Sequence, residues 1–207
     1  MNTRERLIDA AARIIRDRGI TAVTTKDVAL EAGFAEATIY RHFQDKTDLL
    51  LNVLRERLPG HFLALIEEFP RRAGRGDVAA NLEQLATAAV AFFDQNAPFT
   101  AALGADRALA ASHYARLRQL GTGPVAVQNA LETYLREEQR LGRVHADVNP
   151  LAAAYLLLGI CFNYARSRYI GSDPTGFSEE EFVTEIVRTL ITGLAPRPAP
   201  ETTDPDR

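Results

Sequence analysis

The chain has 207 residues, of which 46% are hydrophobic and 25% charged, and its formal net charge of -3 argues against a protein that packages nucleic acid in bulk. Its single cysteine, Cys161, excludes an internal disulfide framework and fits a reducing compartment. The chain has no apolar run long enough to span a bilayer, and its charged N-terminus does not resemble a secretion signal. We therefore expect a cytoplasmic protein with no membrane partner.

Charge is unevenly spread along the chain. Residues 1–57 hold 10 Lys+Arg and 9 Asp+Glu, a net charge of +1, and residues 58–207 carry the remaining -4. Any contact with DNA must therefore come from a few placed groups rather than from a broad cationic surface.

Apolar residues recur at helical spacing from the start of the chain. The pattern predicts a helix over residues 3–18 that ends at Gly19. The next helix is expected to be capped by Thr25 and to end at Gly33, where the turn needs a positive φ. A third short helix over 36–42 follows.

Two hydrophobic residues of this third helix region, Ile39 and Phe43, are the expected core anchors. Asp45 then opens a fourth helix, and Asp48 three residues later favours a capping box. The segment Leu58-Pro59-Gly60 interrupts that helix and predicts a kink or a break, and we consider a hinge at Pro59 as well as a static kink.

The rest of the chain stays helical in pattern. After a Gly- and Arg-rich linker at residues 70–76, helices are expected near 77–95, 99–111, 124–141, 150–170 and 179–194. No period-two alternation is long enough for a sheet. The prediction is an all-α fold of about nine helices, with a three-helix domain at 1–48, a second helical domain at 49–195, and a disordered, proline-rich tail at 196–207.

Residues 25–48 have the layout of a helix-turn-helix DNA reader: two short helices joined by a glycine turn, with a third helix capped just after. A recognition helix must present small or polar side chains so that its backbone can lie deep in the major groove, and residues 35–42 do so. Thr25 and Lys46 lie at the starts of the flanking helices, where free backbone N–H groups suit a phosphate.

Three segments carry a family resemblance: Thr24-Thr25-Lys26-Asp27-Val28-Ala29, Ala32-Gly33-Phe34, and Thr38-Ile39-Tyr40-Arg41-His42-Phe43 followed by Asp45-Lys46. With these motifs the chain resembles the TetR family of bacterial transcriptional regulators. The turn Gly142-Arg143-Val144 before Asp147 is similar to the family's lead-in to its penultimate helix.

The resemblance implies which residues contact double-stranded DNA. It implies phosphate contacts at Thr25, Thr38, Tyr40, His42 and Lys46, and base-edge contacts at Glu36, Ala37 and Arg41. Glu36 departs from the basic or neutral residue that is common there. Its carboxylate would either repel phosphates or accept a hydrogen bond from cytosine N4.

Simpler roles stay open for several of these side chains. Thr25 as a helix cap only, His42 as a solvated surface residue and Tyr40 as a core aromatic are the alternatives.

The resemblance implies that the second domain binds a ligand and forms a dimer. Wide apolar faces on the helices at 150–170 and 179–194 independently indicate an isologous homodimer, the alternative being that both faces complete an intramolecular core. Aromatic and amphipathic side chains could line a pocket for a lipophilic small molecule, the alternative again being plain core: Phe92, Phe93, Phe99, His113, Tyr114, Tyr134 and Tyr164.

These features together predict a dimeric, ligand-responsive transcriptional regulator, a repressor that a small molecule releases from a palindromic operator. No cofactor, metal or catalytic residue is expected, since the four histidines are scattered and no phosphate-binding glycine loop occurs. The alternatives are an all-helical enzyme without a recognisable catalytic motif and a helical protein-interaction module.

Overall fold

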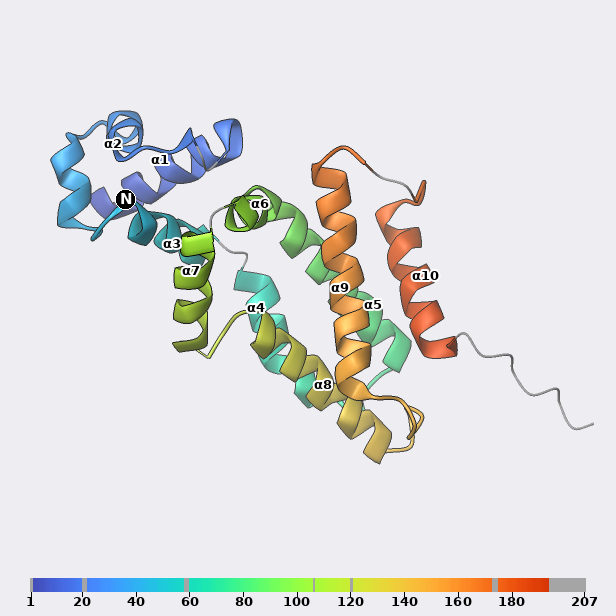
Figure 1. The fold of residues 1–207 in the computed structure, drawn as a ribbon. Coiled ribbons are helices and arrows are strands. Elements are labelled where there is room, and N and C mark those ends of the chain that lie inside the picture. The colour runs from blue at the N-terminus through green and yellow to red at the C-terminus, as the bar shows by residue number, and fades with distance from the viewer. Residues whose placement is uncertain are drawn as a thin grey trace, which may run out of the picture.

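A computed structural model describes residues 2–19, 22–57, 60–105, 107–119, 121–172 and 175–193, and these residues form helices and no strand. An N-terminal body and a larger C-terminal body lie side by side (Figure 1). The N-terminal body consists of α1 (Thr3–Arg18), α2 (Thr25–Ala32), the 3-10 helix η2 (Glu36–Arg41) and α3 (Lys46–Arg57). The C-terminal body consists of α4 (Gly60–Glu68), the 3-10 helix η3 (Phe69–Arg72), α5 (Val78–Gln95), α6 (Ala97–Ala105), α7 (Arg107–Gln119), α8 (Pro124–Arg140), α9 (Pro150–Tyr169) and α10 (Glu179–Thr192). The all-α prediction is confirmed.

The N-terminal body is built on the apolar stripe of α1, which packs against α2 and α3. The stripe that periodicity predicts is buried: Leu7, Ile8, Ala11, Ile14 and Ile15. Burying a Leu or Ile side chain stabilises the fold by about 2 kcal/mol relative to leaving it exposed, so this stripe holds the three helices together. The same core takes in Leu49, Leu50 and Val53 of α3, and therefore continues past the domain boundary expected at residue 48.

The turn after α2 has the predicted geometry. Gly33 adopts φ 76° and ψ 34°, the left-handed region that favours glycine. The Arg6 guanidinium donates a hydrogen bond of 2.8 Å to the Ala32 carbonyl, and a Cβ at Gly33 would lie 3.3 Å from this guanidinium. Glycine at this position thus allows both the turn and the close approach of α1.

The cap of α2 corrects the sequence prediction. Thr24, not Thr25, is the N-cap: its backbone is extended and its hydroxyl oxygen accepts a hydrogen bond of 3.0 Å from the Asp27 N–H. Thr25 is already the first helical residue, so its side chain cannot fold back over the helix end. That leaves the Thr25 hydroxyl free to bond to another element.

The segment expected as a third helix over 36–42 forms a 3-10 helix over Glu36–Arg41, anchored by the buried side chains of Ile39 and Phe43 as predicted. The next helix begins as expected after Asp45, whose carboxylate accepts a 2.7 Å hydrogen bond from the Asp48 N–H. The Asp48 carboxylate in turn accepts a 2.9 Å hydrogen bond from the N–H of Gln44, one residue before the cap. The end of the recognition segment is therefore tied to the start of α3.

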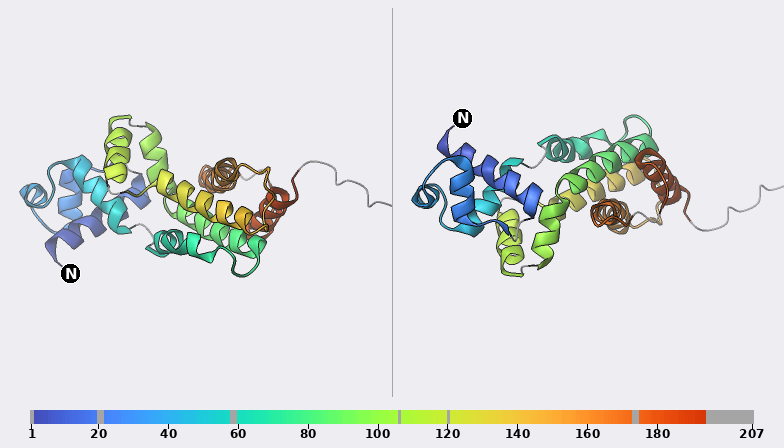
Figure 2. Two further views of the ribbon diagram at one scale, coloured as in Figure 1. Left: turned by 90° about the horizontal axis from the view of Figure 1, so that it is seen from below. Right: turned by 90° about the horizontal axis from the view of Figure 1, so that it is seen from above.

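In the C-terminal body, α5 packs against α9 and α10, and α8 packs against α9 (Figure 2). The prediction of a single helix at 99–111 is wrong, because α6 and α7 are separate helices. The described residues therefore form ten α-helices, α1 to α10, rather than about nine. None of the α7 side chains that the structure describes is fully buried. Since α7 has no strong apolar stripe, periodicity could not locate its ends.

A buried carboxylate joins three segments of this body. Glu138 on α8 is fully buried, lies 3.1 Å from Nε of Arg143, and accepts a 3.1 Å hydrogen bond from the Gly74 N–H. Burial raises the pKa of the neighbouring Tyr134 hydroxyl to about 12. This arrangement explains Arg143 in the turn before α9, and it fixes the loop at residues 73–76 that the sequence marks as a linker.

Two predictions fall outside the described residues: the interruption at Leu58 and Pro59, and the tail at 196–207. In the part of the chain that the structure describes, no helix is long and apolar enough to cross a membrane. In the same part, no three His, Cys, Asp or Glu side chains lie close enough to hold a metal ion.

Candidate nucleic-acid interface

The residues expected to contact DNA lie on the paired elements α2 and η2 and at the start of α3. Thr25 and Thr38 are half-buried, and the other members of the set are exposed: Glu36, Ala37, Tyr40, Arg41, His42 and Lys46. Ile39 and Phe43 hold η2 from beneath. The small and polar side chains of the predicted recognition segment are therefore presented outward on a fixed backbone.

Three of these side chains meet at the contact of α2 with η2. The Thr25 hydroxyl donates a 2.6 Å hydrogen bond to the Glu36 carboxylate, and its oxygen lies 3.5 Å from the Tyr40 hydroxyl oxygen. The bond to a carboxylate is charge-assisted and short. Sequence reasoning placed all three in the interface but did not foresee that they bond to one another.

Tyr40 and His42 are surface groups. The Tyr40 side chain is 57% exposed, which excludes its alternative role as a core aromatic. The exposed His42 imidazole is tilted against the buried Phe43 ring, with 6.5 Å between ring centroids. Both side chains thus lie on the surface of the N-terminal body, where they can reach a bound duplex.

Some basic residues of the N-terminal body are paired with carboxylates, and others are not. Arg4 pairs with Glu56 at 2.6 Å and Arg13 with Glu31 at 3.1 Å, so their charges are neutralised within the domain. Lys26, Arg41 and Lys46 have no ion-pair partner among the described residues. The small net charge of this domain therefore does not prevent a local positive potential beside η2.

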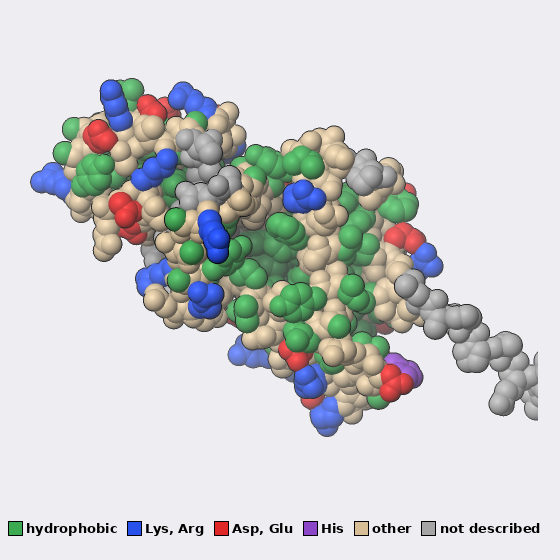
Figure 3. Space-filling model, viewed as in Figure 1, with side chains coloured by type: hydrophobic (Ala, Val, Ile, Leu, Met, Phe, Trp, Pro, Cys, Tyr) green, Lys and Arg blue, Asp and Glu red, His purple; other side chains and the backbone are tan. Residues whose placement is uncertain are grey.

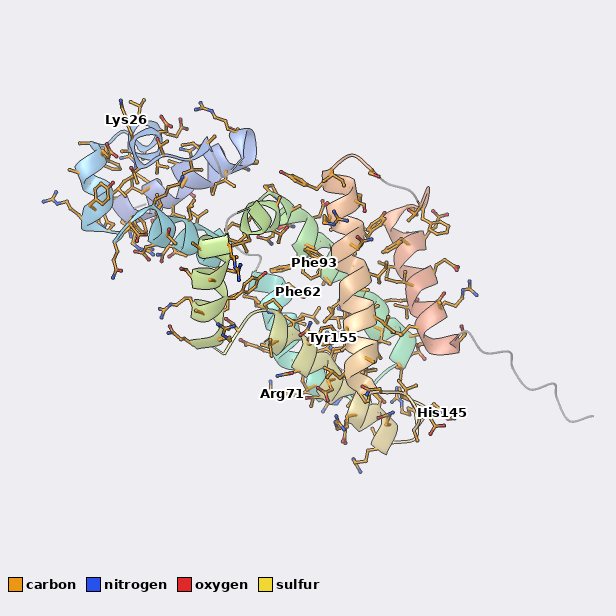
Figure 4. The ribbon with its side chains drawn as sticks, viewed as in Figure 1. Lys26, Phe62, Arg71, Phe93, His145 and Tyr155 are labelled. Atoms are coloured by element: carbon orange, nitrogen blue, oxygen red, sulfur yellow. The ribbon has the colours of Figure 1, made fainter. Side chains whose placement is uncertain are left out.

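Lys26 is a residue that sequence reasoning left out of the contact set. It is exposed in the first turn of α2, next to Thr25, and its side chain points away from the body of the domain (Figure 4). Its position directly after a predicted phosphate contact was the available indication.

The seven residues expected to line an effector pocket do not come together. Tyr134 lies in the core of the C-terminal body against Phe69, with 4.7 Å between ring centroids. The buried Tyr164 stacks on Phe182 of α10 at 3.8 Å. These two have the core role that was the alternative.

Phe92 and Phe93 belong to an aromatic cluster with Phe62 of α4 and Phe162 of α9. Phe62 stacks on Phe92 at 4.6 Å between ring centroids, and Phe93 meets Phe162 edge-on at 5.4 Å. Hydrophobic side chains gather in a hollow between α7 and α9 (Figure 3), where the labelled Phe62 and Phe93 lie (Figure 4). Residues from three separate helices form this cluster, and helical periodicity cannot indicate that they are neighbours.

Phe99, His113 and Tyr114 form a second aromatic group, on α6 and α7. The His113 imidazole lies edge-on between the other two rings, 5.3 Å from each ring centroid, and its burial lowers its pKa. Phe99 itself packs in the core of the N-terminal body. This group therefore lies at the junction of the two bodies.

A stripe of hydrophobic side chains on α9 faces away from the rest of the chain. Its exposed members are Leu151, Tyr155, Leu156 and Ile160, next to the small residues Ala152 and Gly159. Part of the two apolar faces that were expected to form the dimer interface is buried inside the subunit: Leu158, Phe182, Val183 and Val187. On α10 the buried side chains pack toward α5, while Ile191 near the end of the helix is 49% exposed.

The model of the bacterial regulatory proteins of the tetR family matches residues 7–53, a segment that contains every predicted DNA contact. Over these residues the chain is similar to the TetR family. The similarity explains why α2, η2 and their glycine turn have the geometry of a helix-turn-helix.

Relatives of the TetR domain include the fatty acid metabolism regulator protein of Bacillus subtilis (strain 168), which is 36% identical over 62 residues. The match covers 30% of this chain and 31% of that protein, so this chain spans less than a third of that protein's length. The nucleoid occlusion factor SlmA of Shewanella woodyi matches a longer stretch, 87% of this chain and 91% of that protein, at 23% identity.

Solved structures share the fold over nearly the whole chain. The fatty acid degradation regulator FadR of Bacillus halodurans has a TM-score of 0.71 at 22% identity, and the match covers 95% of this chain and 98% of that one. FadR of Bacillus subtilis in complex with stearoyl-CoA has a TM-score of 0.69 at 18% identity, with 92% and 99% covered. The C-terminal body thus has the architecture found beside TetR domains in these regulators.

Proposed function

We propose that this protein is a homodimeric transcriptional repressor that binds a palindromic operator and leaves it when a lipophilic small molecule binds. The observation that carries the proposal is the exposed polar set on η2 and α2, held from beneath by Ile39 and Phe43 within a TetR-family domain. A protein that regulates bacterial genes in this way acts in the cytoplasm.

In the proposed complex η2 enters the major groove. The Arg41 guanidinium can donate two parallel hydrogen bonds to guanine O6 and N7, the commonest base-specific contact of this side chain. Lys46 at the start of α3, Thr38 and His42 contact phosphates and fix the register of η2 on the duplex. Ala37 lets the backbone approach the base edges because its side chain is small.

The exposed stripe on α9 supports the proposed homodimer. An exposed apolar surface of this length on a helix is typical of a protein–protein interface, and small residues within it let a second helix approach closely. A two-fold axis beside α9 would bury the stripe of each subunit on that of the other. Two recognition segments related by such an axis require a two-fold symmetric operator.

The proposed effector is a lipophilic molecule that binds at the aromatic cluster of Phe62, Phe92, Phe93 and Phe162. Mostly apolar walls of aromatic side chains are typical of sites for such ligands. The complex of the similar B. subtilis regulator with stearoyl-CoA makes long-chain acyl-CoA the first class of compound to test. Release of DNA would follow if the compound binds better to a dimer whose recognition segments no longer match the operator spacing.

Selection of bound sequences from a random DNA pool tests this function. We expect a two-fold symmetric site, bound with a strong dependence on salt. Arg41→Ala should relax the base preference at one position of each half-site, at a cost of about 1–3 kcal/mol on the operator. Lys46→Ala should weaken binding to operator and unrelated duplexes alike. If neither variant alters the affinity for any duplex, the alternative of a helical interaction module is favoured.

A further inference from the structure

We propose that Glu36 determines specificity by competing with DNA for the Thr25 hydroxyl. In the free protein the Glu36 carboxylate binds this hydroxyl, and a DNA phosphate must displace the carboxylate to bind there. Only a cytosine in the operator compensates for this displacement. The inference rests on the proposed function, because it assigns a role within the same interface. The Glu36 carboxylate then has both roles that the sequence leaves open: it first opposes a phosphate and then contacts a base.

The geometry of the free protein supplies the first half of this role. The Glu36 carboxylate accepts a 2.6 Å hydrogen bond from the Thr25 hydroxyl, and Tyr40 lies 3.5 Å from the same hydroxyl. Thr25 and Tyr40 are both expected phosphate contacts. A carboxylate therefore stands where an anionic phosphate oxygen would accept the same proton, and the two negative groups cannot share it.

The exposure of Glu36 supplies the second half. The side chain is exposed at the first position of η2, at the end of the segment expected to point into the groove. Once a phosphate takes the Thr25 hydroxyl, the carboxylate needs a new donor. In the major groove the amino groups of cytosine N4 and adenine N6 are such donors, but adenine also presents the acceptor N7 beside N6, which repels a carboxylate. Guanine O6 and N7 and thymine O4 are acceptors that repel it as well.

Displacement of the carboxylate therefore costs more binding free energy on unrelated DNA than on the operator. Every duplex must displace the carboxylate from Thr25, so binding to unrelated DNA is weakened throughout. Only a duplex with cytosine at the facing position restores a hydrogen bond to the carboxylate without placing an acceptor beside it. Because phosphate contacts dominate non-specific binding, displacement of the carboxylate lowers non-specific binding more than it lowers operator binding.

The test compares Glu36→Gln with the wild type on the selected operator and on a duplex of scrambled sequence, by fluorescence anisotropy at fixed salt. Glutamine keeps the shape but not the charge. We expect binding to the scrambled duplex to strengthen on the order of tenfold, the size of one charge-assisted hydrogen bond, and operator binding to strengthen less. In a repeated selection one half-site position should change from cytosine to adenine, the base that glutamine recognises.

Asp17→Asn is the matched control, because it removes one negative charge from the same domain at an exposed residue that does not contact Thr25. Thr25→Val provides a second arm. Without the hydroxyl there is nothing for phosphate and carboxylate to compete for, so Glu36→Gln should bring a much smaller gain in the Thr25→Val background. A general charge effect would give the same gain in both backgrounds.

The outcomes separate this inference from the proposed function. If the wild type selects no sequence from the pool, the function itself fails. If it selects a symmetric site but Glu36→Gln behaves like Asp17→Asn, or its gain persists in the Thr25→Val background, the role of Glu36 alone is overturned. Unchanged thermal unfolding of each variant shows that the comparison concerns binding.

Discussion

At the scale of single residues, two adjacent threonines differ in what they stabilise. Thr24 has the extended backbone of a cap and bonds to the Asp27 N–H, whereas Thr25 is helical and bonds across to Glu36. Their order follows from geometry: only the residue before the first helical position can fold its side chain over the free N–H groups. Sequence alone could not decide between them, because both are good caps.

This difference gives a prediction for stability. Thr24→Ala should lower the free energy of unfolding of the N-terminal body by about 1 kcal/mol, the usual contribution of an N-cap. Thr25→Ala should lower it less, because the bond it loses is on the surface, but it should alter DNA affinity. Urea denaturation followed by circular dichroism measures the first effect. Equal losses of stability in the two variants would contradict this assignment of the cap.

At the scale of elements, the sequence predicts best those helices whose apolar stripe faces one core. The bounds of α1, α5, α8, α9 and α10 lie within about two residues of the expected ranges. The division into α6 and α7 was missed because alanines occupy much of residues 97–119 and give no clear stripe. The two short helices of the reading domain were found because Gly33 and Asp45 mark their ends.

The candidate sites show the same limit. The DNA contacts were predicted from one continuous motif, and they lie on neighbouring elements. The effector residues were chosen as aromatic side chains of the middle helices, and they lie in different places, because periodicity shows that a residue is apolar but not which helix it meets. Phe62 and Phe162, which complete the cluster around Phe92 and Phe93, belong to helices far apart in the chain.

The exposed stripe on α9 gives the prediction at this scale. Leu156 is 65% exposed, so Leu156→Glu should leave the subunit folded while placing a charge in the proposed interface. We expect the protein to sediment as a monomer and to lose affinity for a two-fold symmetric operator. Leu30→Glu is the control, since Leu30 is 76% exposed on α2 and lies outside the stripe. A Leu156→Glu variant that sediments like the wild type would exclude α9 as the dimer interface.

At the scale of the whole molecule, the two bodies are joined through α6. Its residues Phe99 and Leu103 are buried in the core of the N-terminal body, although α6 follows directly after α5 of the other body. Asn96 separates α5 from α6 and caps the end of α5. It lies four residues after Phe92 and three residues after Phe93. A displacement of the end of α5 by an effector would therefore reach the reading domain through packed side chains rather than through a free linker.

This connection predicts which helix exchanges its amide hydrogens faster when a buried side chain of α6 is removed. Phe99→Ala removes a buried ring from the N-terminal core, a change that costs about 3 kcal/mol, so hydrogen exchange of the α1 amides should become about 100-fold faster. The α9 amides should keep their wild-type rates, because Phe99 is not part of their core. Leu131→Ala, a buried residue of α8, is the control and should give the reverse pattern. Should Phe99→Ala leave α1 unchanged and accelerate α9 instead, α6 would belong mechanically to the C-terminal body, and an effector signal would have to reach the DNA by another path.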